Sequence, residues 1–191
     1  TLRYFAGQVF KYGVQLHLGQ RVSAADLLAG AFDEVILATG VSPRALDLPG
    51  IDHPKVLSYI DVLKHQQKIG QKVAIIGAGG IGFDVAEYLS QETASTSLNV
   101  EAFMDEWGVD MTYQAKGGLK HPQPEKPERT IYLLQRSKGK LGERLGKTTG
   151  WIHRTGRKHR DVKMIAGASY DKIDDQGLHI TVNDQPTVLE V

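Results

Sequence analysis

Cysteine is absent from this 191-residue sequence, and its absence excludes several kinds of chemistry. Without cysteine, the chain forms no disulfide and holds neither a cysteine-ligated zinc ion nor a cysteine-ligated iron–sulfur cluster. Long apolar runs are missing as well, since none approaches the roughly 20 residues needed to span a bilayer. Residues 1–20 also lack the basic start and apolar block of a signal peptide. Together these absences predict a cytoplasmic protein without membrane contact.

An excess of charge of one sign is also lacking, because 23 Lys and Arg residues face 22 Asp and Glu residues. One stretch departs from this balance: between Arg136 and Lys163 there are ten basic residues and only two acidic ones. Such a patch suits nucleic acid, a phosphate-rich dinucleotide or a solvated helix face. Trp151 is the only Phe, Tyr or Trp in this stretch that is available to stack on bases, so we expect no nucleic-acid partner.

Candidate catalytic and metal-binding residues are also scarce. No two of the seven histidines lie three or four residues apart, as a metal-binding pair on a helix would. No grouping of serine, histidine and acid can be singled out from spacing. The sequence therefore predicts no metal site and names no catalytic residue.

What the sequence does contain is an alternation of helical and strand patterns. Apolar residues three and four apart predict helices, whereas β-branched or continuous apolar runs predict strands. Because strands alternate with helices, the pattern is typical of an α/β fold. The predicted helices cover residues 2–12, 22–30, 59–66, 80–91, 100–107 and 149–160. The predicted strands cover residues 14–18, 35–38, 72–76, 130–135, 162–166, 169–174, 177–182 and 187–191.

The strongest motif is a glycine-rich turn between the strand over 72–76 and the helix over 80–91. In a G-x-G-x-x-G fingerprint the first glycine makes the turn and the second lets backbone approach a pyrophosphate. The third lets the helix pack close to the strand. The N–H groups and partial positive charge of the helix start then hold the phosphates. A tight strand-to-helix turn without a ligand is the alternative. The predicted dinucleotide-binding residues are Gly77, Ala78, Gly79, Gly80, Ile81 and Gly82.

The residues after the next strand bear on the choice between NAD(H) and NADP(H). An acidic residue at that place takes the ribose hydroxyls of NAD(H), but here the sequence reads Gln135-Arg136. A carboxylate repels a 2′-phosphate, whereas a guanidinium pairs with it bidentately. Lys138 and Lys140 add positive charge nearby. We therefore expect NADP(H), bound in part by Gln135, Arg136 and Lys138; a solvated loop arginine is the alternative.

Four particular stretches resemble bacterial NADPH-dependent 2,4-dienoyl-CoA reductase: Asp52–Tyr59, Gly77–Asp84, Gly146–Arg154 and Lys172–His179. The resemblance covers essentially the whole chain, including a polar insertion over residues 92–128. It implies a flavoenzyme whose N-terminal TIM barrel holds FMN and a 4Fe–4S cluster and reduces a dienoyl thioester in fatty acid β-oxidation. The C-terminal part of such an enzyme is similar to glutathione-reductase-type flavoproteins. Hydride passes there from NADPH to FAD, and electrons continue through the cluster to FMN.

By this resemblance the chain contains two parts of such an enzyme. Residues 1–66 are expected to be a partial FAD-binding domain, with Ala38, Thr39 and Gly40 as its ATG motif. Residues 67–191 are expected to be an NADPH-binding, Rossmann-like domain with three layers. The remaining domains of the full-length enzyme are its expected partners.

We expect the chain to be a portion of a longer polypeptide. Thr1–Phe5 has the pattern of the middle of a helix, and Thr187–Val191 that of an unfinished strand. The barrel, the cluster cysteines and the glycine turn of the FAD domain are not among these residues. The resemblance thus implies that the chain alone binds NADP(H) but does not reduce dienoyl-CoA. A non-catalytic nucleotide-binding module and a stand-alone NADPH:flavin oxidoreductase stay open as alternatives.

Overall fold

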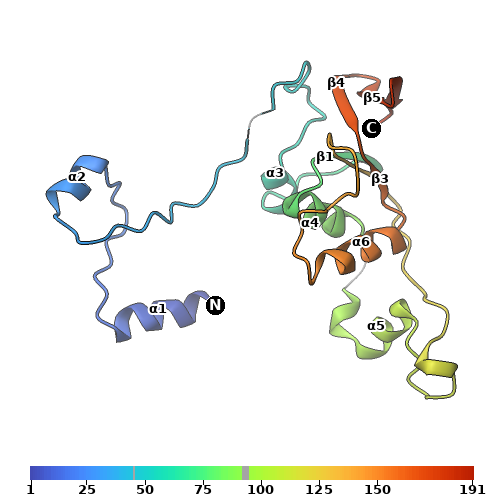
Figure 1. Cartoon of the computed structure of the whole chain (residues 1–191), viewed down its shortest axis with the longest axis horizontal. Coiled ribbons are helices and arrows are strands. Elements are labelled where there is room, and N and C mark those ends of the chain that lie inside the picture. Colours follow the sequence, from blue (N-terminus) through green and yellow to red (C-terminus); the bar gives the residue numbers. More distant parts are fainter. Residues whose placement is uncertain (45, 92–94) are drawn as a thin grey trace. The chain divides into compact units, whose positions relative to one another are not determined.

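The computed structural model describes residues 1–44, 46–91 and 95–191. The chain divides into two compact units, Thr1–Arg44 and Ala45–Val191 (Figure 1). The second unit begins before residue 66, where the predicted boundary between the FAD and NADPH domains falls. Which residues serve which cofactor is a separate question, and the predicted domain assignment stays a prediction.

The first unit contains two helices. The helix α1 spans Leu2–Lys11, which confirms the helix predicted over 2–12, and α2 spans Ala24–Ala29. Ser23 and Asp26 form a capping box at the start of α2. The Ser23 Oγ accepts from the Asp26 N–H at 3.3 Å, and the Asp26 carboxylate accepts from the Ser23 N–H at 2.8 Å. Neither helix has a buried residue, so packing does not add to this local stabilisation.

The strands predicted over residues 14–18 and 35–38 are not formed. Val35, Ile36 and Leu37 are 47%, 90% and 78% exposed, respectively. A strand is held by backbone hydrogen bonds to a neighbouring strand, and residues 1–44 contain no strand with which either segment could pair. The prediction of these two strands was therefore wrong, because neither the alternating pattern over 14–18 nor the continuous apolar run over 35–38 supplies a pairing partner for the backbone.

The second unit is built around a three-stranded parallel sheet in the order β1-β2-β3. Ile76 of β1 pairs with Leu134 of β2, so these two strands end side by side. Along β2, Ile131 and Leu133 point to one face of the sheet, while Tyr132 and Leu134 point to the other. The strands are β1 (Lys72–Ile76), β2 (Thr130–Leu134) and β3 (Lys163–Ile165).

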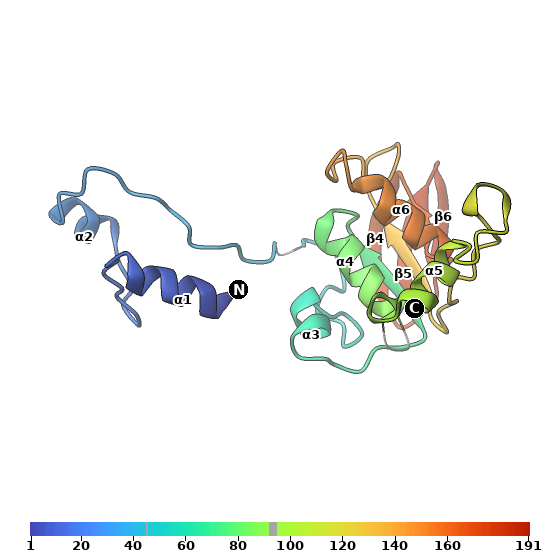
Figure 2. The ribbon, with the colours of Figure 1, turned by 90° about the horizontal axis from the view of Figure 1, so that it is seen from below.

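Two helices cover one face of this sheet (Figure 2). The helix α4 (Gly80–Leu89) follows β1, and α6 (Gly150–His159) joins β2 to β3. Phe83 and Leu89 of α4 pack with Ile131 and Leu133 in a buried cluster. Burial of this apolar helix face holds α4 against the strand that precedes it.

The opposite face of the parallel sheet is covered by an antiparallel sheet in the order β4-β5-β6. Leu178 and Ile180 of β5 are buried against Leu134 of the parallel sheet. Helices, parallel sheet and antiparallel sheet thus form three layers, which confirms the predicted Rossmann-like three-layer α/β fold. The antiparallel strands are β4 (Ala168–Asp174), β5 (Gly177–Val182) and β6 (Gln185–Leu189).

The segment before the first helix of the second unit is tied to the antiparallel sheet. Leu48 is buried in the cluster between the two sheets. The Ile173 N–H donates to the Pro49 carbonyl at 2.8 Å, and His53 Nε2 lies 3.1 Å from Asp175 Oδ1. Residues 46–57 therefore pack with the second unit.

The helix α3 spans Tyr59–Leu63 and ends earlier than the predicted residue 66. Ser58 and Asp61 form its capping box: the Ser58 Oγ accepts from the Asp61 N–H at 3.2 Å, and the Asp61 carboxylate accepts from the Ser58 N–H at 2.9 Å. Val62 is buried and packs in the cluster beneath α4. This helix therefore combines a local cap with a contact to the core.

The predicted insertion, of which residues 95–128 are described, docks on the end of α6. Its helix α5 has the predicted bounds, Val100–Trp107. Arg160 Nη2 donates to Glu106 Oε1 at 2.8 Å, and these side chains are only 8% and 10% exposed. The Trp107 ring lies 5.3 Å from the His159 ring. Two short 3-10 turns complete the insertion, η1 (Thr96–Leu98) and η2 (Lys116–Gly118).

Candidate nucleotide-binding site

The three fingerprint glycines occupy three different environments between β1 and α4. Gly77 has a φ of +109°, which an L side chain rarely adopts, and its N–H donates to the Leu134 carbonyl at 2.9 Å. Gly79 is the N-cap of α4. A Cβ on Gly82 would lie 1.9 Å from the Gly77 carbonyl oxygen, so only glycine allows this close approach of helix and strand. The turn therefore has the geometry that the fingerprint requires.

The start of α4 offers backbone donors without a competing cap. Gly79 has no side chain to cap the helix, and no acidic residue lies in its first turn. The first N–H groups of a helix have no partner within the helix, and together with the helix dipole they favour an anion. A Cβ placed on Gly77, Gly79 or Gly80 would meet nothing within 4 Å. This open space beside uncapped donors fits a pyrophosphate group.

Ala78 and Ile81, the other two predicted turn residues, differ in their surroundings. Ala78 packs against the buried cluster beneath α4, so its side chain has a structural role and its backbone shapes the turn. Ile81 is 47% exposed at the first turn of the helix. Their contact with a nucleotide stays a prediction.

The predicted 2′-phosphate residues follow β2 at the same sheet edge as the glycine turn, because β1 and β2 are parallel and end side by side. Arg136 and Lys138 are exposed. Burial raises the pKa of the Tyr170 hydroxyl, and the nearby Arg136 guanidinium acts in the opposite direction. Arg136 therefore lies close enough to β4 to interact with Tyr170 electrostatically.

The Gln135 side chain does not project freely into this region. Its Nε2 donates to the Ser137 carbonyl at 3.1 Å and to the Gly139 carbonyl at 3.3 Å. The sequence predicted that Gln135 belongs to the cofactor site. In the structure, the amide contacts the loop that carries Arg136 and Lys138.

The loop that follows wraps around the first turn of α4. Leu141 is buried, and a Cβ on Gly142 would lie 2.8 Å from the Phe83 ring. Arg154 Nη1 donates to the Gly142 carbonyl at 3.0 Å, which fixes the loop to α6. The exposed basic side chains on this loop add positive charge around the glycine turn; they are Lys140, Arg144 and Lys147.

Two arginines of the basic stretch have structural roles that sequence spacing did not reveal. Arg157 is buried and pairs with Glu87 at 3.0 Å, and its Nη1 also donates to the Phe83 carbonyl. Arg160 is buried against Glu106. Their spacing of three residues places them on one face of α6. This spacing is the feature of the sequence from which a shared structural role could have been inferred. The exposed basic surface is accordingly smaller than the ten basic residues suggest.

The predicted FAD residues Ala38, Thr39 and Gly40 lie in the first unit. All three are exposed, and Gly40 has a φ of +77°. They lie outside any helix or strand. Their role toward FAD stays a prediction.

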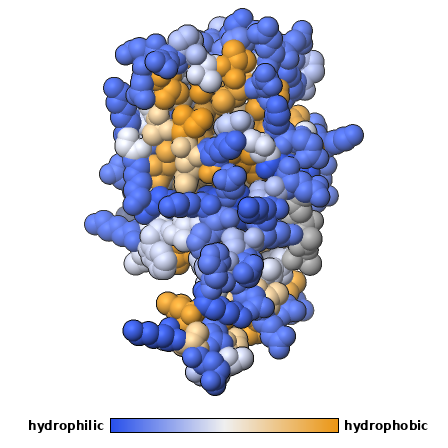
Figure 3. Space-filling view, turned by 90° about the vertical axis from the view of Figure 1, so that its right-hand side faces the viewer, coloured by the Kyte–Doolittle hydropathy of each residue, from blue (hydrophilic) through white to orange (hydrophobic). Residues whose placement is uncertain are grey.

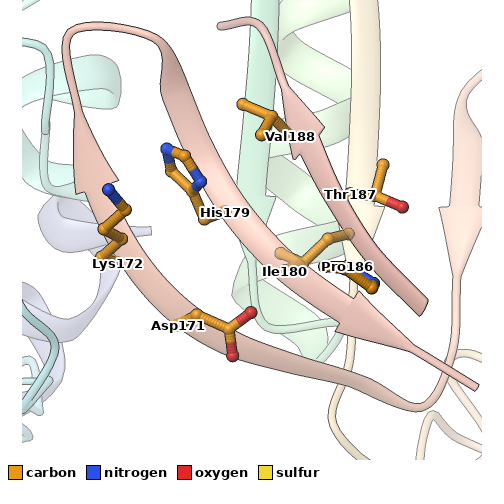
Figure 4. A pocket seen from close by; sticks show the side chains of 7 residues that line it. All are labelled: Asp171, Lys172, His179, Ile180, Pro186, Thr187 and Val188. Atoms are coloured by element: carbon orange, nitrogen blue, oxygen red, sulfur yellow. The ribbon is translucent and has the colours of Figure 1, made fainter. Parts of the chain in front are cut away.

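A hollow of about 320 Å³ lies on the outer face of the antiparallel sheet (Figure 4). Three of its polar side chains, Asp171, Lys172 and His179, are already paired with neighbours. Asp174 contacts Lys172 Nζ at 2.8 Å and His179 Nε2 at 2.9 Å, and Thr181 donates to Asp171 at 2.9 Å. The hydrogen bonds from Lys172 and His179 hold the pKa of the Asp174 carboxyl well below its usual range. Because these side chains already bond to one another, the hollow offers a ligand fewer free hydrogen-bonding groups than the uncapped start of α4 does.

Apolar side chains also gather on the side of the second unit shown in Figure 3. Val188 of β6, beside the hollow, is 40% exposed. Apolar surface without converging polar groups defines no specific ligand chemistry. Within residues 1–44, 46–91 and 95–191, no group of three His, Asp or Glu side chains is placed to hold a metal ion. Over the same described ranges, no helix is both long enough and apolar enough to cross a membrane.

Sequence comparison identifies the family of the chain. The family profile described as pyridine nucleotide-disulphide oxidoreductase matches residues 6–191. The chain therefore belongs to the pyridine nucleotide-disulphide oxidoreductase family, a family of flavoprotein oxidoreductases that use NAD(P)H. This membership agrees with a glycine turn built for a dinucleotide.

Individual relatives are reductases that are much longer than this chain. Cinnamate reductase of Clostridium sporogenes is 38% identical over 97 residues, which are 51% of this chain and 14% of that protein. Bilirubin reductase of Mediterraneibacter gnavus is 31% identical over 98 residues, which are 51% of this chain and 15% of that protein. The chain thus matches only about one seventh of the length of these relatives.

Among solved structures, the complex of 2-naphthoyl-CoA reductase with 2-naphthoyl-CoA is similar to this chain with a TM-score of 0.65 at 22% identity. The match covers 99% of this chain and 23% of that protein. It supports the fold assignment.

Proposed function

We propose that this chain is the NADPH-binding portion of a multi-cofactor reductase of the 2,4-dienoyl-CoA reductase type, which reduces unsaturated fatty acyl-CoA in β-oxidation. The observation that carries the nucleotide assignment is the open, uncapped start of α4 beside an exposed arginine. Gly79 and Gly80 leave space at the helix start, and Arg136 follows the neighbouring parallel strand. One edge of the sheet thus combines pyrophosphate donors with a cation suited to a 2′-phosphate.

Within this proposal, each part of the site has a separate task. The backbone N–H groups at the start of α4 hold the pyrophosphate, while Arg136 and Lys138 hold the ribose 2′-phosphate. Ionic hydrogen bonds of this kind are stronger than neutral ones, so Arg136 favours NADPH over NADH. When bound, NADPH supplies the hydride that passes to FAD, and the protein positions the nucleotide for that transfer.

The substrate assignment rests on sequence. The four stretches that resemble 2,4-dienoyl-CoA reductase all lie in the second unit, from residue 52 to residue 179. Cinnamate reductase, one of the relatives, takes its name from an acid whose double bond is conjugated to a carboxyl group, and a dienoyl thioester has the same type of conjugation. By the same resemblance, we assign acyl-CoA reduction and FMN to the remaining domains of the full-length enzyme. The 4Fe–4S cluster is assigned there as well, because this chain has no cysteine to ligate it. FAD is assigned in part to residues 1–66.

The test is calorimetric titration of the chain with NADP+, NAD+ and FAD, together with Arg136→Ala. Loss of the guanidinium should weaken NADP+ binding by about tenfold or more, because one charged hydrogen-bonding partner of the phosphate is removed. NAD+ lacks that phosphate and should bind nearly as before. Lys158→Ala is the matched control, since Lys158 is an exposed cation on α6. It removes the same charge from the basic stretch but should leave both affinities unchanged.

The outcomes separate this proposal from its alternatives. Equal losses of NADP+ and NAD+ binding in Arg136→Ala would contradict the NADPH assignment. A yellow preparation that oxidises NADPH would instead favour a stand-alone NADPH:flavin oxidoreductase. A chain that binds nucleotide but serves no reductase when joined to the remaining domains would favour a non-catalytic module.

A further inference from the structure

The Gln135 side chain ties together the loop that follows β2. The two bonds from its Nε2 end on the Ser137 and Gly139 carbonyls, at 3.1 and 3.3 Å. Its backbone is fixed as well: the Gln135 N–H donates to the Ile165 carbonyl at 3.0 Å, and the Ala168 N–H donates to the Gln135 carbonyl at 3.0 Å. The amide therefore acts from an anchored position at the end of the sheet.

A second contact holds the same loop from the turn between β3 and β4. The Gly167 N–H donates to the Ser137 carbonyl at 3.0 Å. The Ser137 carbonyl thus accepts from both Gly167 and Gln135, using both of its lone pairs. Gly167 has a φ of +69°, and a Cβ there would lie 3.4 Å from Lys138 Cγ. The loop is therefore restrained on two sides.

The restraints alternate with the charges along the loop. Residues 135, 137 and 139 make the hydrogen bonds, whereas the intervening Arg136 and Lys138 are exposed. A fixed backbone reduces the conformational freedom that long cationic side chains lose when they bind a phosphate. We propose that Gln135 is a positioning residue for ribose 2′-phosphate recognition, which acts by holding the loop that presents Arg136 and Lys138. This role rests on the proposed function of the chain.

The experiment compares Gln135→Met with Gln114→Met in calorimetric titrations with NADP+ and NAD+. Methionine keeps much of the side-chain length but removes the amide donor. Gln114 Nε2 makes a similar bond, to the Thr112 carbonyl at 3.3 Å, within the insertion. We expect Gln135→Met to weaken NADP+ binding by about fivefold to tenfold, from the loss of two hydrogen bonds that preorganise the loop. NAD+ binding should stay within about twofold, and Gln114→Met should change neither affinity.

A double-mutant cycle with Arg136→Ala tests whether Gln135 acts through the arginine. If it does, Gln135→Met should weaken NADP+ binding much less in the Arg136→Ala background than in the wild-type background. Hydrogen exchange of the amides in residues 136–140 provides a readout without ligand. It should become faster in Gln135→Met and stay unchanged in Gln114→Met.

Failure of this inference differs from failure of the proposed function. A wild-type chain that does not prefer NADP+ to NAD+ would overturn both. A wild-type chain that prefers NADP+, together with Gln135→Met that keeps the full preference, would overturn only the role of Gln135. Equal weakening of NADP+ and NAD+, or additive effects of the two substitutions, would reduce Gln135 to a general structural residue. Loss of the NADP+ preference with coupling to Arg136 would support the positioning role.

Discussion

Two apolar segments of similar composition behave differently in the two units. Residues 35–38 read Val-Ile-Leu-Ala, and residues 73–76 read Val-Ala-Ile-Ile. The second segment forms most of β1 and pairs along its length with β2. The first forms no strand, and its Ile36 is 90% exposed.

The difference shows that an apolar sequence pattern describes only the side chains of a segment. To form a strand, the backbone of that segment must also pair with a neighbouring strand. β2 gives β1 that partner, and α4 and β4–β6 cover the two faces of the sheet. The described residues of the first unit include no strand that could do the same for residues 35–38. Burial should therefore contribute to stability in the second unit and little in the first.

The largest effect should come from truncating the sheet core. Leu133 of β2 is fully buried, so Leu133→Ala should lower the free energy of unfolding by about 3 kcal/mol through lost burial and a residual cavity. Leu37→Ala is the matched substitution in the first unit. Because Leu37 is 78% exposed, it should change the same free energy by less than about 0.5 kcal/mol. Urea unfolding monitored by circular dichroism measures both.

The result for Leu37→Ala tests the conclusion that burial contributes little to stability in the first unit. A cost close to that of Leu133→Ala would mean that residues 35–38 are buried in solution, in the chain alone or in an assembly of copies. Measurement at two protein concentrations distinguishes these cases, because stabilisation by assembly depends on concentration.

The glycine turn was predictable because its geometry depends on local backbone properties. The sequence predicted a turn at Gly77, an open approach at Gly79 and a close contact at Gly82, and the structure shows these three environments. The three-layer arrangement was predicted as well, from the order of the helices and strands together with the family resemblance. Local periodicity and special backbone conformations are properties that a short segment carries by itself.

Features that depend on distant contacts were not predictable in the same way. Arg157 and Arg160 looked like part of a basic surface, yet they are buried against acids that lie 70 and 54 residues away in the sequence. Nothing in the sequence near Gln135 indicated that its amide would bond to two loop carbonyls. The failure over residues 35–38 has the same origin, since pairing is decided by chain outside the segment.

A smaller effect is expected where α4 approaches the strand before it. Gly82→Ala should cost about 2 kcal/mol, because its Cβ would overlap the Gly77 carbonyl oxygen and force the helix away from β1. Gly80→Ala adds the same methyl group to the same helix, at a place where it meets nothing within 4 Å. It should stay within about 1 kcal/mol of wild type and slightly favour the helix. Equal effects in urea unfolding would show that β1 does not depend on close packing of α4.

The smallest effect should come from the two capping boxes, which have nearly the same geometry in the two units. Ser58 and Ser23 each lower the pKa of the aspartate three residues on, chiefly through the side-chain hydrogen bond. Ser58→Ala should lower the free energy of unfolding by about 1 kcal/mol, because α3 buries Val62 in the core. Ser23→Ala should leave the cooperative urea transition unchanged and reduce only the helix signal, because α2 buries no residue.

The pH dependence of the free energy of unfolding further distinguishes Ser58→Ala from Ser23→Ala. The folded-state pKa of Asp61 lies below its unfolded value, so its contribution is complete at neutral pH and is lost as the pH falls through the folded-state pKa. In Ser58→Ala that part of the acid dependence should shrink, whereas Ser23→Ala should leave the acid dependence of the cooperative transition as in wild type. If Ser23→Ala altered that transition as much as Ser58→Ala does, α2 would have to be coupled to a buried core, and the contrast between the two units would fail. Capping is the sharper test because the local interaction is the same in both helices, so any difference in effect reports only on what each helix packs against.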